Sequence, residues 1–399
     1  MSKWEEKRLE DIIEVNPTVK LKKGEIYPFI DIDKVSPTRR SVTNEEVKTY
    51  EGQSSSKFCN GDTVFSRITP CLENRKIAKV FIDGDAAFGS TEFYVFRAKK
   101  KKADERFTYY LTSSDAVVLP AINSMTGASG RQRADKRFIQ RLKLNLPDLP
   151  TQERIADILS TYDDLIEANN RRIELLEQAA QELYKEWFVR FRFPGHENAK
   201  FENGLPEGWS IQRLSSYGRI ETGKTPSMEK QENYGNNVMF IKTPDMHGNT
   251  FVIKSEEMLS ECGHLTQPKK LLPPNSIMVT CIGSGGIVAI NAEQAHTNQQ
   301  INSIVLNDST KLEWLYFTCK SLKSTIELFG ATGTTMTNLS KGKFERLKVI
   351  DPDDTLILQY HKFVAPMLNK IKSLMYQNQN LADQRDLLLP RLMSGKLEV

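Results

Sequence analysis

The sequence predicts a mixed α+β fold in which two similar domains are separated by a pair of long antiparallel helices. Three observations support this prediction: an internal repeat, a heptad pattern after each copy, and short strand-like runs inside each copy. Trp4 and Arg8 recur as Trp209 and Arg213, a displacement of 205 residues. Solenoid repeats span only about 20–50 residues, so each copy is long enough to be a domain with its own core.

The two copies keep nearly the same register along their length. The Arg-Leu-Lys sequence at residues 141–143 recurs at residues 346–348, again displaced by 205, whereas Tyr110 and Tyr316 are 206 residues apart. A single inserted residue therefore separates otherwise parallel halves. This duplication predicts internal pseudo-two-fold symmetry, with two equivalent surfaces on which partners could dock.

A long helix is predicted after each copy. No glycine or proline lies between Pro150 and Pro194, and apolar residues in this segment alternate at spacings of three and four. This heptad pattern is typical of a coiled coil, and the residues displaced by 205 repeat it in the same phase. Two matched seams favour pairing of the helices with each other. The predicted seam consists of Leu159, Tyr162, Ile166, Ile173, Leu176, Leu183, Val364, Met367, Ile371, Leu374, Leu381 and Leu388.

Polar residues and prolines interrupt this seam. Asn169, Asn378 and Arg385 occupy seam positions, which suggests control of the helix register. Pro366 predicts that the second helix either begins near it or kinks there, because proline lacks a backbone donor and clashes one turn back. Pro390 limits the far end of this helix, and residues 394–395 (Ser-Gly) are the predicted terminus.

The repeat and the helices divide the chain into four parts. We expect the first domain at residues 1–149, the first helix at 150–193, the second domain at 194–354, and the second helix with a C-terminal tail at 355–399. A helix of about 40 residues spans roughly 60 Å, which exceeds the width of a small domain. The alternative interpretation is ordinary helix packing inside one large domain.

Short strand-like runs separated by turns make each domain α+β. Helices follow the strands near residues 105–119 and 311–329. The loop at residues 39–57 of the first domain differs most from its counterpart at residues 245–270 of the second domain. Such divergence is expected for one scaffold that binds two different targets. The predicted strands are 27–32, 63–68, 77–82 and 92–97 in the first domain, and 238–242, 276–282, 287–290 and 301–306 in the second.

The composition is that of an ordinary globular protein. The 399 residues carry a net charge of +4, which permits nucleic-acid binding without requiring it. The five cysteines form no short-spaced pairs, so we expect reduced, mostly buried thiols. No apolar run is long enough to cross a membrane and the N-terminus is too polar for a secretory signal, so the expected location is the cytoplasm.

The sequence offers no recognisable catalytic or metal site. The five histidines include no pair at metal-ligand spacing, and neither a nucleophile elbow nor a Walker-type loop is present. Residues 283–286 (Gly-Ser-Gly-Gly) lie between two short strands rather than at the start of a helix, so nucleotide binding is not favoured. We therefore predict no catalytic residue, metal or cofactor in this chain.

Basic loops are the strongest indication of a binding function. Residues 126–130 are small and polar, and Arg131, Arg133 and Lys136 follow them. The corresponding segment, 332–338, is followed by Lys341. Small polar residues followed by cations suit contacts to phosphates and base edges, although a solvated surface loop would have the same composition.

Several short motifs occur along the chain: residues 149–155 (Leu-Pro-Thr-Gln-Glu-Arg-Ile) at the start of the first helix, Trp187-Phe188-Val189 at its end, Gly61-Asp62 with residues 67–74, residues 298–302 (Asn-Gln-Gln-Ile-Asn), and residues 392–397 at the end of the second helix. Together with the duplication, they resemble the specificity subunit of type I restriction-modification systems. The resemblance covers essentially the whole chain.

This resemblance implies a non-catalytic function. Each domain would be a target recognition domain that reads one half of a bipartite double-stranded DNA sequence. The two helices would set the spacer and dock methylating subunits, two of them by symmetry. Those partners would use S-adenosylmethionine, whereas this chain would hold no cofactor. The resemblance leaves open whether nuclease or translocase subunits join.

Candidate DNA contacts follow from side-chain chemistry within this interpretation. Arginine reads guanine, asparagine and glutamine read adenine, and lysine more often binds phosphate. Arg67 lies where the second domain has Thr280 or Cys281, so the two halves cannot use the same base chemistry there. The candidates are Arg67, Arg75, Lys76, Arg131, Arg133 and Lys136 in the first domain, and Lys242, Asn298, Gln299, Thr335, Asn338 and Lys341 in the second.

Two other functions remain compatible with the sequence. One is a coiled-coil assembly scaffold without a role in DNA binding. The other is a DNA-modifying enzyme with an unrecognised active site.

Overall fold

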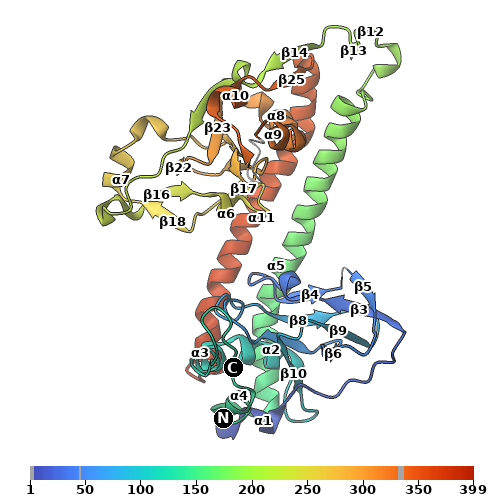
Figure 1. Ribbon diagram of the computed structural model, residues 1–399, viewed down its shortest axis with the longest axis vertical. Coiled ribbons are helices and arrows are strands. Elements are labelled where there is room, and N and C mark those ends of the chain that lie inside the picture. Colours follow the sequence, from blue (N-terminus) through green and yellow to red (C-terminus); the bar gives the residue numbers. More distant parts are fainter. Residues whose placement is uncertain (1–3, 45, 331–336) are drawn as a thin grey trace. The chain divides into compact units, whose positions relative to one another are not determined.

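A computed structural model describes residues 4–44, 46–330 and 337–399. The chain forms two compact units, one made of Met1–Ala168 with Asn378–Val399 and the other of Asn169–Gln377. Each unit contains a globular α+β body and a segment of both long helices, α5 (Leu149–Tyr184) and α11 (Asp354–Met393) (Figure 1). The predicted fold class is therefore confirmed.

Unit 1 contains two sheets and a two-stranded ribbon. A five-stranded sheet has the order β2-β10-β7-β8-β4, a four-stranded sheet has the order β5-β3-β9-β6, and β1 pairs with β11. The strands are β1 Trp4–Arg8, β2 Ile13–Val15, β3 Ile26–Ile30, β4 Ser41–Thr43, β5 Glu46–Thr49, β6 Ser56–Cys59, β7 Thr63–Ser66, β8 Ile77–Phe81, β9 Ala86–Gly89, β10 Phe93–Ala98 and β11 Lys143–Pro147. The short helices are α1 Leu9–Ile12, α2 Glu105–Ser113, α3 Asp115–Asn123 and α4 Lys136–Gln140.

Unit 2 repeats this plan. A five-stranded sheet has the order β15-β23-β19-β21-β17, a smaller sheet has the order β18-β16-β22, and β14 pairs with β25. These strands are β14 Ser210–Arg213, β15 Gly218–Thr222, β16 Tyr234–Ile241, β17 Phe251–Val252, β18 Glu257–Leu259, β19 Ile277–Thr280, β21 Val288–Asn291, β22 Ala295–Thr297, β23 Ile301–Leu306 and β25 Lys348–Asp351. Two further pairs are β12 Phe201–Glu202 with β13 Leu205–Pro206, and β20 Ile282–Gly283 with β24 Thr337–Asn338. The short helices are α6 Thr243–Met246, α7 Glu261–Leu265, α8 Leu312–Ser321, α9 Lys323–Gly330 and α10 Lys341–Glu345.

The five-stranded sheets of the two units have the same strand order, which confirms the repeat at the level of topology. In unit 1, α2 contacts β7 and β8 of the five-stranded sheet, and in unit 2, α8 contacts β19 and β21. Strand β6 pairs with β9 where unit 2 has an isolated bridge between Leu272 and Ala295. The framework is therefore shared, while the connections between its strands differ.

Both long helices take part in the cores of both units. In unit 1, Leu159 of α5 and Leu392 of α11 are buried together with strand residues such as Phe65. In unit 2, α5 continues as one π-helical turn, Lys185–Val189, which buries Trp187 among aromatic residues of α11. Full burial of one large apolar side chain contributes about 1.5–3 kcal/mol, so these contacts fix the helices firmly to each body.

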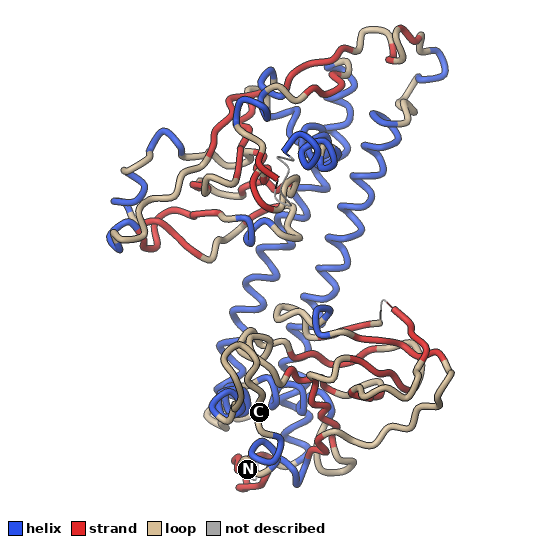
Figure 2. The backbone as a smooth tube through the Cα atoms, in the orientation of Figure 1, coloured by secondary structure: helices blue, strands red, loops and turns tan. Residues whose placement is uncertain are grey.

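The predicted antiparallel pairing of the helices is confirmed. In unit 1, Arg154 near the start of α5 donates to the carbonyl of Val399, and Asp163 farther along α5 pairs with Arg385. In unit 2, the two helices run side by side (Figure 2), and the hydroxyl of Tyr360 donates to the carbonyl of Ala180 at 3.0 Å. All twelve predicted seam residues are buried or partly buried.

The bounds of the second long helix are close to the prediction, whereas the effect of Pro366 and the end of the first helix differ from it. Helix α11 begins at Asp354 and continues through both Pro366 and Pro390, so neither proline marks its end. Both prolines are exposed, and water can bond the backbone groups that proline leaves unpaired. The first helix ends with its π-helical turn rather than at residue 193, because Phe191 has a positive φ of 56° and leaves the helical path.

The C-terminal turn of α11 requires a glycine, as the sequence predicts. Gly395 has a φ of +70°, and a Cβ atom there would lie 2.9 Å from Cε2 of Trp4. We expect Gly395→Ala to destabilise unit 1 by at least about 1–2 kcal/mol, because an L-residue is strained in this conformation. Chemical denaturation measures the change. Gly342→Ala on α10 is the matched control, since the nearest atom lies 3.9 Å away; equal effects of the two variants would contradict the explanation.

The five cysteines are free thiols, as predicted, but only Cys281 and Cys319 are buried, and Cys262 is exposed. Cys59 and Cys71 are partly buried, so four of the five thiols are at least partly covered and Cys262 on α7 is the exception.

A buried histidine in unit 2 predicts a pH-dependent stability. His296 is fully buried on β22, and its Nε2 lies 3.0 Å from Nδ1 of His264. Burial is the larger cause and the neighbouring His264 the smaller cause of a pKa of His296 lowered to about 4. The unfolded chain therefore binds this proton first, near its ordinary pKa of about 6.5, and stability declines as the pH falls from there towards 4, by roughly 2–3 kcal/mol.

His296→Gln removes this titration, so the variant should lose less stability than the parent between pH 7 and pH 4.5 in urea denaturation. An identical pH slope for both proteins would exclude His296 as the cause.

Candidate nucleic-acid interface

Two loops that are distant in the sequence meet at one end of the five-stranded sheet in unit 1. Ile68, just after β7, and Thr126 each form a β-bridge with Arg133. The amide of Thr69 donates to the carbonyl of Gln132 at 3.0 Å, and the amide of Gln132 donates to Oγ1 of Thr69 at 3.1 Å. The structure therefore brings the Arg67 and Arg133 positions together, as a shared binding surface requires.

A single carboxylate holds the two arginines. Glu92 precedes β10 and accepts from Nε of Arg67 at 3.2 Å, and from Nε and Nη2 of Arg133 at 2.9 and 2.6 Å. The guanidinium of Arg67 also lies over the ring of Tyr94, whose hydroxyl donates to the carbonyl of Ala134. Hydrogen bonds from Arg133, followed by the charges of both arginines, keep the pKa of Glu92 below its ordinary value. The carboxylate therefore stays charged at neutral pH and orients both cations.

The remaining predicted cations of this loop lie nearby. Arg131 is exposed, and its carbonyl accepts from Nη1 of Arg133 at 3.4 Å. Lys136 is half-buried at the start of α4, where the carboxylate of Asp135 caps the helix by accepting from the amide of Phe138. Glu92 and the β-bridges thus place Arg67 beside the segment that carries Arg131 and Arg133, and Lys136 begins the helix that follows.

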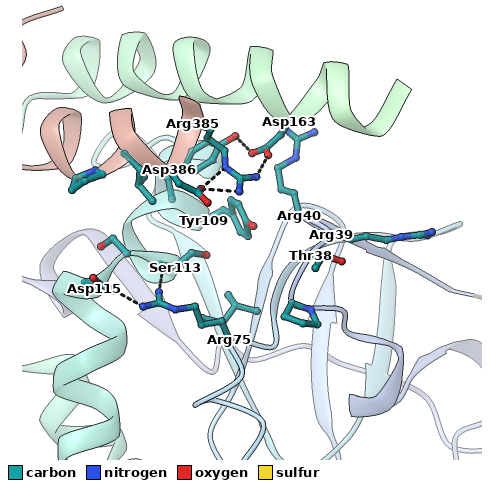
Figure 3. A pocket seen from close by; sticks show the side chains of 16 residues that line it. Thr38, Arg39, Arg40, Arg75, Tyr109, Ser113, Asp115, Asp163, Arg385 and Asp386 are labelled. Atoms are coloured by element: carbon teal, nitrogen blue, oxygen red, sulfur yellow. Dashed lines mark hydrogen bonds and ion pairs between the residues drawn. The ribbon is translucent and has the colours of Figure 1, made fainter. Parts of the chain in front are cut away.

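Arg75 and Lys76 do not join this group. Arg75 donates to the carbonyl of Ser113 and pairs with Asp115 on the edge of a pocket of about 350 Å³ (Figure 3). Lys76 donates to the carbonyl of Ile32 at 3.0 Å. Both side chains therefore serve contacts inside unit 1, which the sequence could not show because every one of these partners is remote along the chain.

The corresponding end of unit 2 presents amides and hydroxyls. Asn298 is buried and donates to Oε1 of Gln300 at 3.0 Å, and Gln299 is exposed and accepts from the hydroxyl of Thr225 at 2.6 Å. Asn338 on β24 is exposed and pairs with Ile282 on β20. Gln299 therefore lies at the surface of this loop, whereas the buried Asn298 bonds within the unit.

Two other predicted contacts of unit 2 have partners of their own. Lys242 forms an ion pair with Glu257, and Lys341 lies 3.8 Å from a carboxylate oxygen of Glu345, one helical turn away. The predicted contact Thr335, like residues 332–336 generally, lies outside the described residues.

Two residues at this surface were missed by the sequence analysis. Glu92 and Gln300 each directly precede the second strand of the five-stranded sheet, β10 or β23. Their signal was weak, because a lone carboxylate or amide before a strand is ordinary turn chemistry. Aligning the two copies by strand rather than by residue displacement would have paired them.

The glycine-rich segment at residues 283–286 begins at the end of β20 and lies before β21, between two short strands as predicted. Gly283 and Gly286 have positive φ values, and the segment leads into strand β21. Within the described ranges, no group of three His, Cys, Asp or Glu side chains could hold a metal ion. No helix of the described chain is long and apolar enough to cross a membrane.

Comparisons with known proteins agree with this arrangement. The model for the type I restriction modification DNA specificity domain matches residues 1–178 and again 206–356. The HindI specificity subunit of Haemophilus influenzae is 30% identical over 88% of this chain and 90% of its own length. The MjaIX specificity subunit of Methanocaldococcus jannaschii is 26% identical over 99% of this chain and 94% of its own length.

A solved structure supports the fold. The S subunit of a type I restriction-modification system from M. genitalium superposes with a TM-score of 0.56 at 14% identity, over 98% of this chain and 96% of its own. Two matched specificity domains, each with the same strand order, and relatives matched over nearly their whole length leave one conclusion. The chain belongs to the family of type I restriction-modification specificity subunits.

Proposed function

We propose that each unit is a target recognition domain that reads one half of a bipartite DNA sequence. The observation that carries this proposal is a pair of equivalent loop surfaces with different chemistry. In unit 1, Glu92 holds Arg67 and Arg133 at the surface, whereas unit 2 offers Gln299 and Thr225. One scaffold with two different polar surfaces suits two different half-sites.

The helices suit the role of a spacer between the half-sites. Helix α5 begins in unit 1 and ends in unit 2, and α11 runs from unit 2 to unit 1. The two long helices end in similar surroundings. After α11, Gly395 lies close to the ring of Trp4, and after α5, the ring of Phe191 packs against Trp209. This internal symmetry favours two equivalent docking surfaces, one for each of two methylating subunits.

Catalysis in this proposal belongs to the partners. The methylating subunits would bind S-adenosylmethionine and transfer the methyl group in the cytoplasm, and this chain would supply sequence selection and geometry alone. Nuclease or translocase subunits are compatible with the proposal but are not required by it.

Selection from random DNA tests the proposal. The full chain, alone and with a methylating partner, is incubated with a random duplex pool, and the DNA retained in a gel shift is sequenced. We expect a motif of two conserved blocks separated by an unread spacer of fixed length. Binding should also weaken steeply with salt, because phosphate contacts release counterions.

Three other outcomes would contradict the proposal. Failure to enrich any two-part motif excludes a bipartite reader. Self-association without DNA binding favours an assembly scaffold, and methylation or cleavage by the pure chain favours an enzyme with its own active site.

A further inference from the structure

Glu92 and Gln300 occupy the same place in the two units. The amide of Arg67 donates to the carbonyl of Glu92 at 2.9 Å, and the amide of Cys281 donates to the carbonyl of Gln300 at 2.7 Å. In the strand register, Phe93 lies opposite Ser66, just as Ile301 lies opposite Thr280. Arg67 and Cys281 are therefore equivalent as well, since each follows the strand that pairs there.

The next backbone bond extends the equivalence. The carbonyl of Arg67 accepts from the amide of Ala134, and the carbonyl of Cys281 accepts from the amide of Leu339, at 2.8 and 2.9 Å. In each unit the chain that returns to the sheet, at Ala134 or Leu339, is therefore fastened to the residue whose amide bonds the carbonyl of Glu92 or Gln300. The backbone is shared, and the side-chain chemistry is what differs.

In unit 1 this position organises cations. The carboxylate of Glu92 is 19% exposed and bonds to Arg67 and Arg133, whose side chains are 30% and 44% exposed. Both guanidiniums thus keep part of their donor surface open while their orientation is fixed. A guanidinium held in this way matches the O6 and N7 acceptors of guanine.

In unit 2 the same position organises neutral groups. Oε1 of Gln300 accepts from Nδ2 of Asn298 at 3.0 Å and from the hydroxyl of Thr243 at 3.3 Å. Cys281, which replaces Arg67, is buried and carries no charge, because burial raises the pKa of its thiol to about 11. Amide side chains match the N6 and N7 pattern of adenine.

We propose that the residue at this shared position determines the base chemistry that each unit presents to DNA. Glu92 positions two guanidiniums for a guanine in the half-site of unit 1, and Gln300, which Asn298 and Thr243 hold in place, presents its own neutral amide to an adenine in the half-site of unit 2. This inference rests on the proposed bipartite reading. It adds which base class each half-site must contain and which residue sets it.

Reciprocal exchange tests the inference. DNA selection with the full chain and its methylating partner is repeated for Glu92→Gln and Gln300→Glu, with Glu92→Asp as a variant that keeps the charge. The parent should select at least one fixed guanine in one block and one fixed adenine in the other. Glu92→Gln should lower the guanine preference by about tenfold, the effect of losing an oriented bidentate contact, while the second block stays unchanged. Gln300→Glu should alter only the second block, and Glu92→Asp should retain the guanine.

The unaffected block serves as an internal control for folding and partner binding, and thermal unfolding of each variant is compared with that of the parent. The inference is overturned if neither block of the parent contains a fixed guanine. It is also overturned if Glu92→Gln lowers affinity or melting temperature without changing base preference, because Glu92 would then only hold the loops together. A parent that selects no bipartite motif contradicts the proposed function itself, so the two failures are distinguishable.

Discussion

Replacing Arg385 by methionine is expected to destabilise unit 1 by about 3–5 kcal/mol, since removal of one partner leaves a buried charge uncompensated. Asp163 on α5 is only 2% exposed, and its carboxylate accepts from Arg385 of α11 (Figure 3). The same carboxylate accepts from the hydroxyl of Tyr110 at 2.6 Å. The Asp163 carboxylate in this way joins the helix pair to α2 of the globular body. Urea denaturation of the parent and the variant measures the loss.

Two control variants separate this explanation from a general loss of charge. Arg391→Met removes an exposed arginine from the same helix and should change stability by less than about 0.5 kcal/mol. The double variant Arg385→Met with Asp163→Asn should recover much of the loss, because an amide in place of Asp163 needs no counter-charge. A double variant as unstable as the single one would contradict the buried-charge explanation.

Inserting one heptad into both α5 and α11 is expected to lengthen the preferred DNA spacer by about three base pairs. Seven residues add about 10.5 Å to a helix, and one base pair occupies about 3.4 Å. The insertions belong between Ala168 and Asn169 and between Gln377 and Asn378, where the compact units divide. Contacts such as Asp163–Arg385 and Tyr360–Ala180 then stay within their own units.

Both half-site sequences should remain as in the parent, because no residue of either globular body changes. Selection from random DNA reports half-sites and spacer in the same experiment. Insertion into one helix alone is the control and should abolish selection of the longer spacer, since the paired seams no longer match in length. An unchanged spacer after the double insertion would exclude the helices as the separator.

The fold was largely predictable because its strongest signals are local or periodic. Strands such as β7 (Thr63–Ser66) and β23 (Ile301–Leu306) are short apolar runs bounded by turns, and both were predicted close to their observed bounds. The heptad seam was predictable for the same reason, since its period depends on the sequence alone. Pro366 misled the prediction, because a proline on the exposed side of a helix breaks fewer buried contacts than one facing the core.

The candidate site was only partly predictable, because side-chain partners are set by tertiary contacts. Arg67 and Arg133 were predicted, and the structure places them on one carboxylate. Arg75 and Lys242 carry the same charge, yet each is paired within its own unit, to Asp115 and Glu257. The spacing of cations along the sequence does not show which of them lie at the candidate interface and which pair with a carboxylate elsewhere in their unit.

The central claim is that the chain selects a bipartite DNA sequence for its methylating partner, and mapping of methylated sites tests it most directly. The chain is expressed together with the methylating subunit in cells that lack other methylation of the same kind, and the modified positions in the genome are sequenced. We expect one motif of two blocks at a fixed spacing, with methylation lost when the chain is omitted. Methylation at a contiguous motif, or at the same sites without this chain, would contradict the claim.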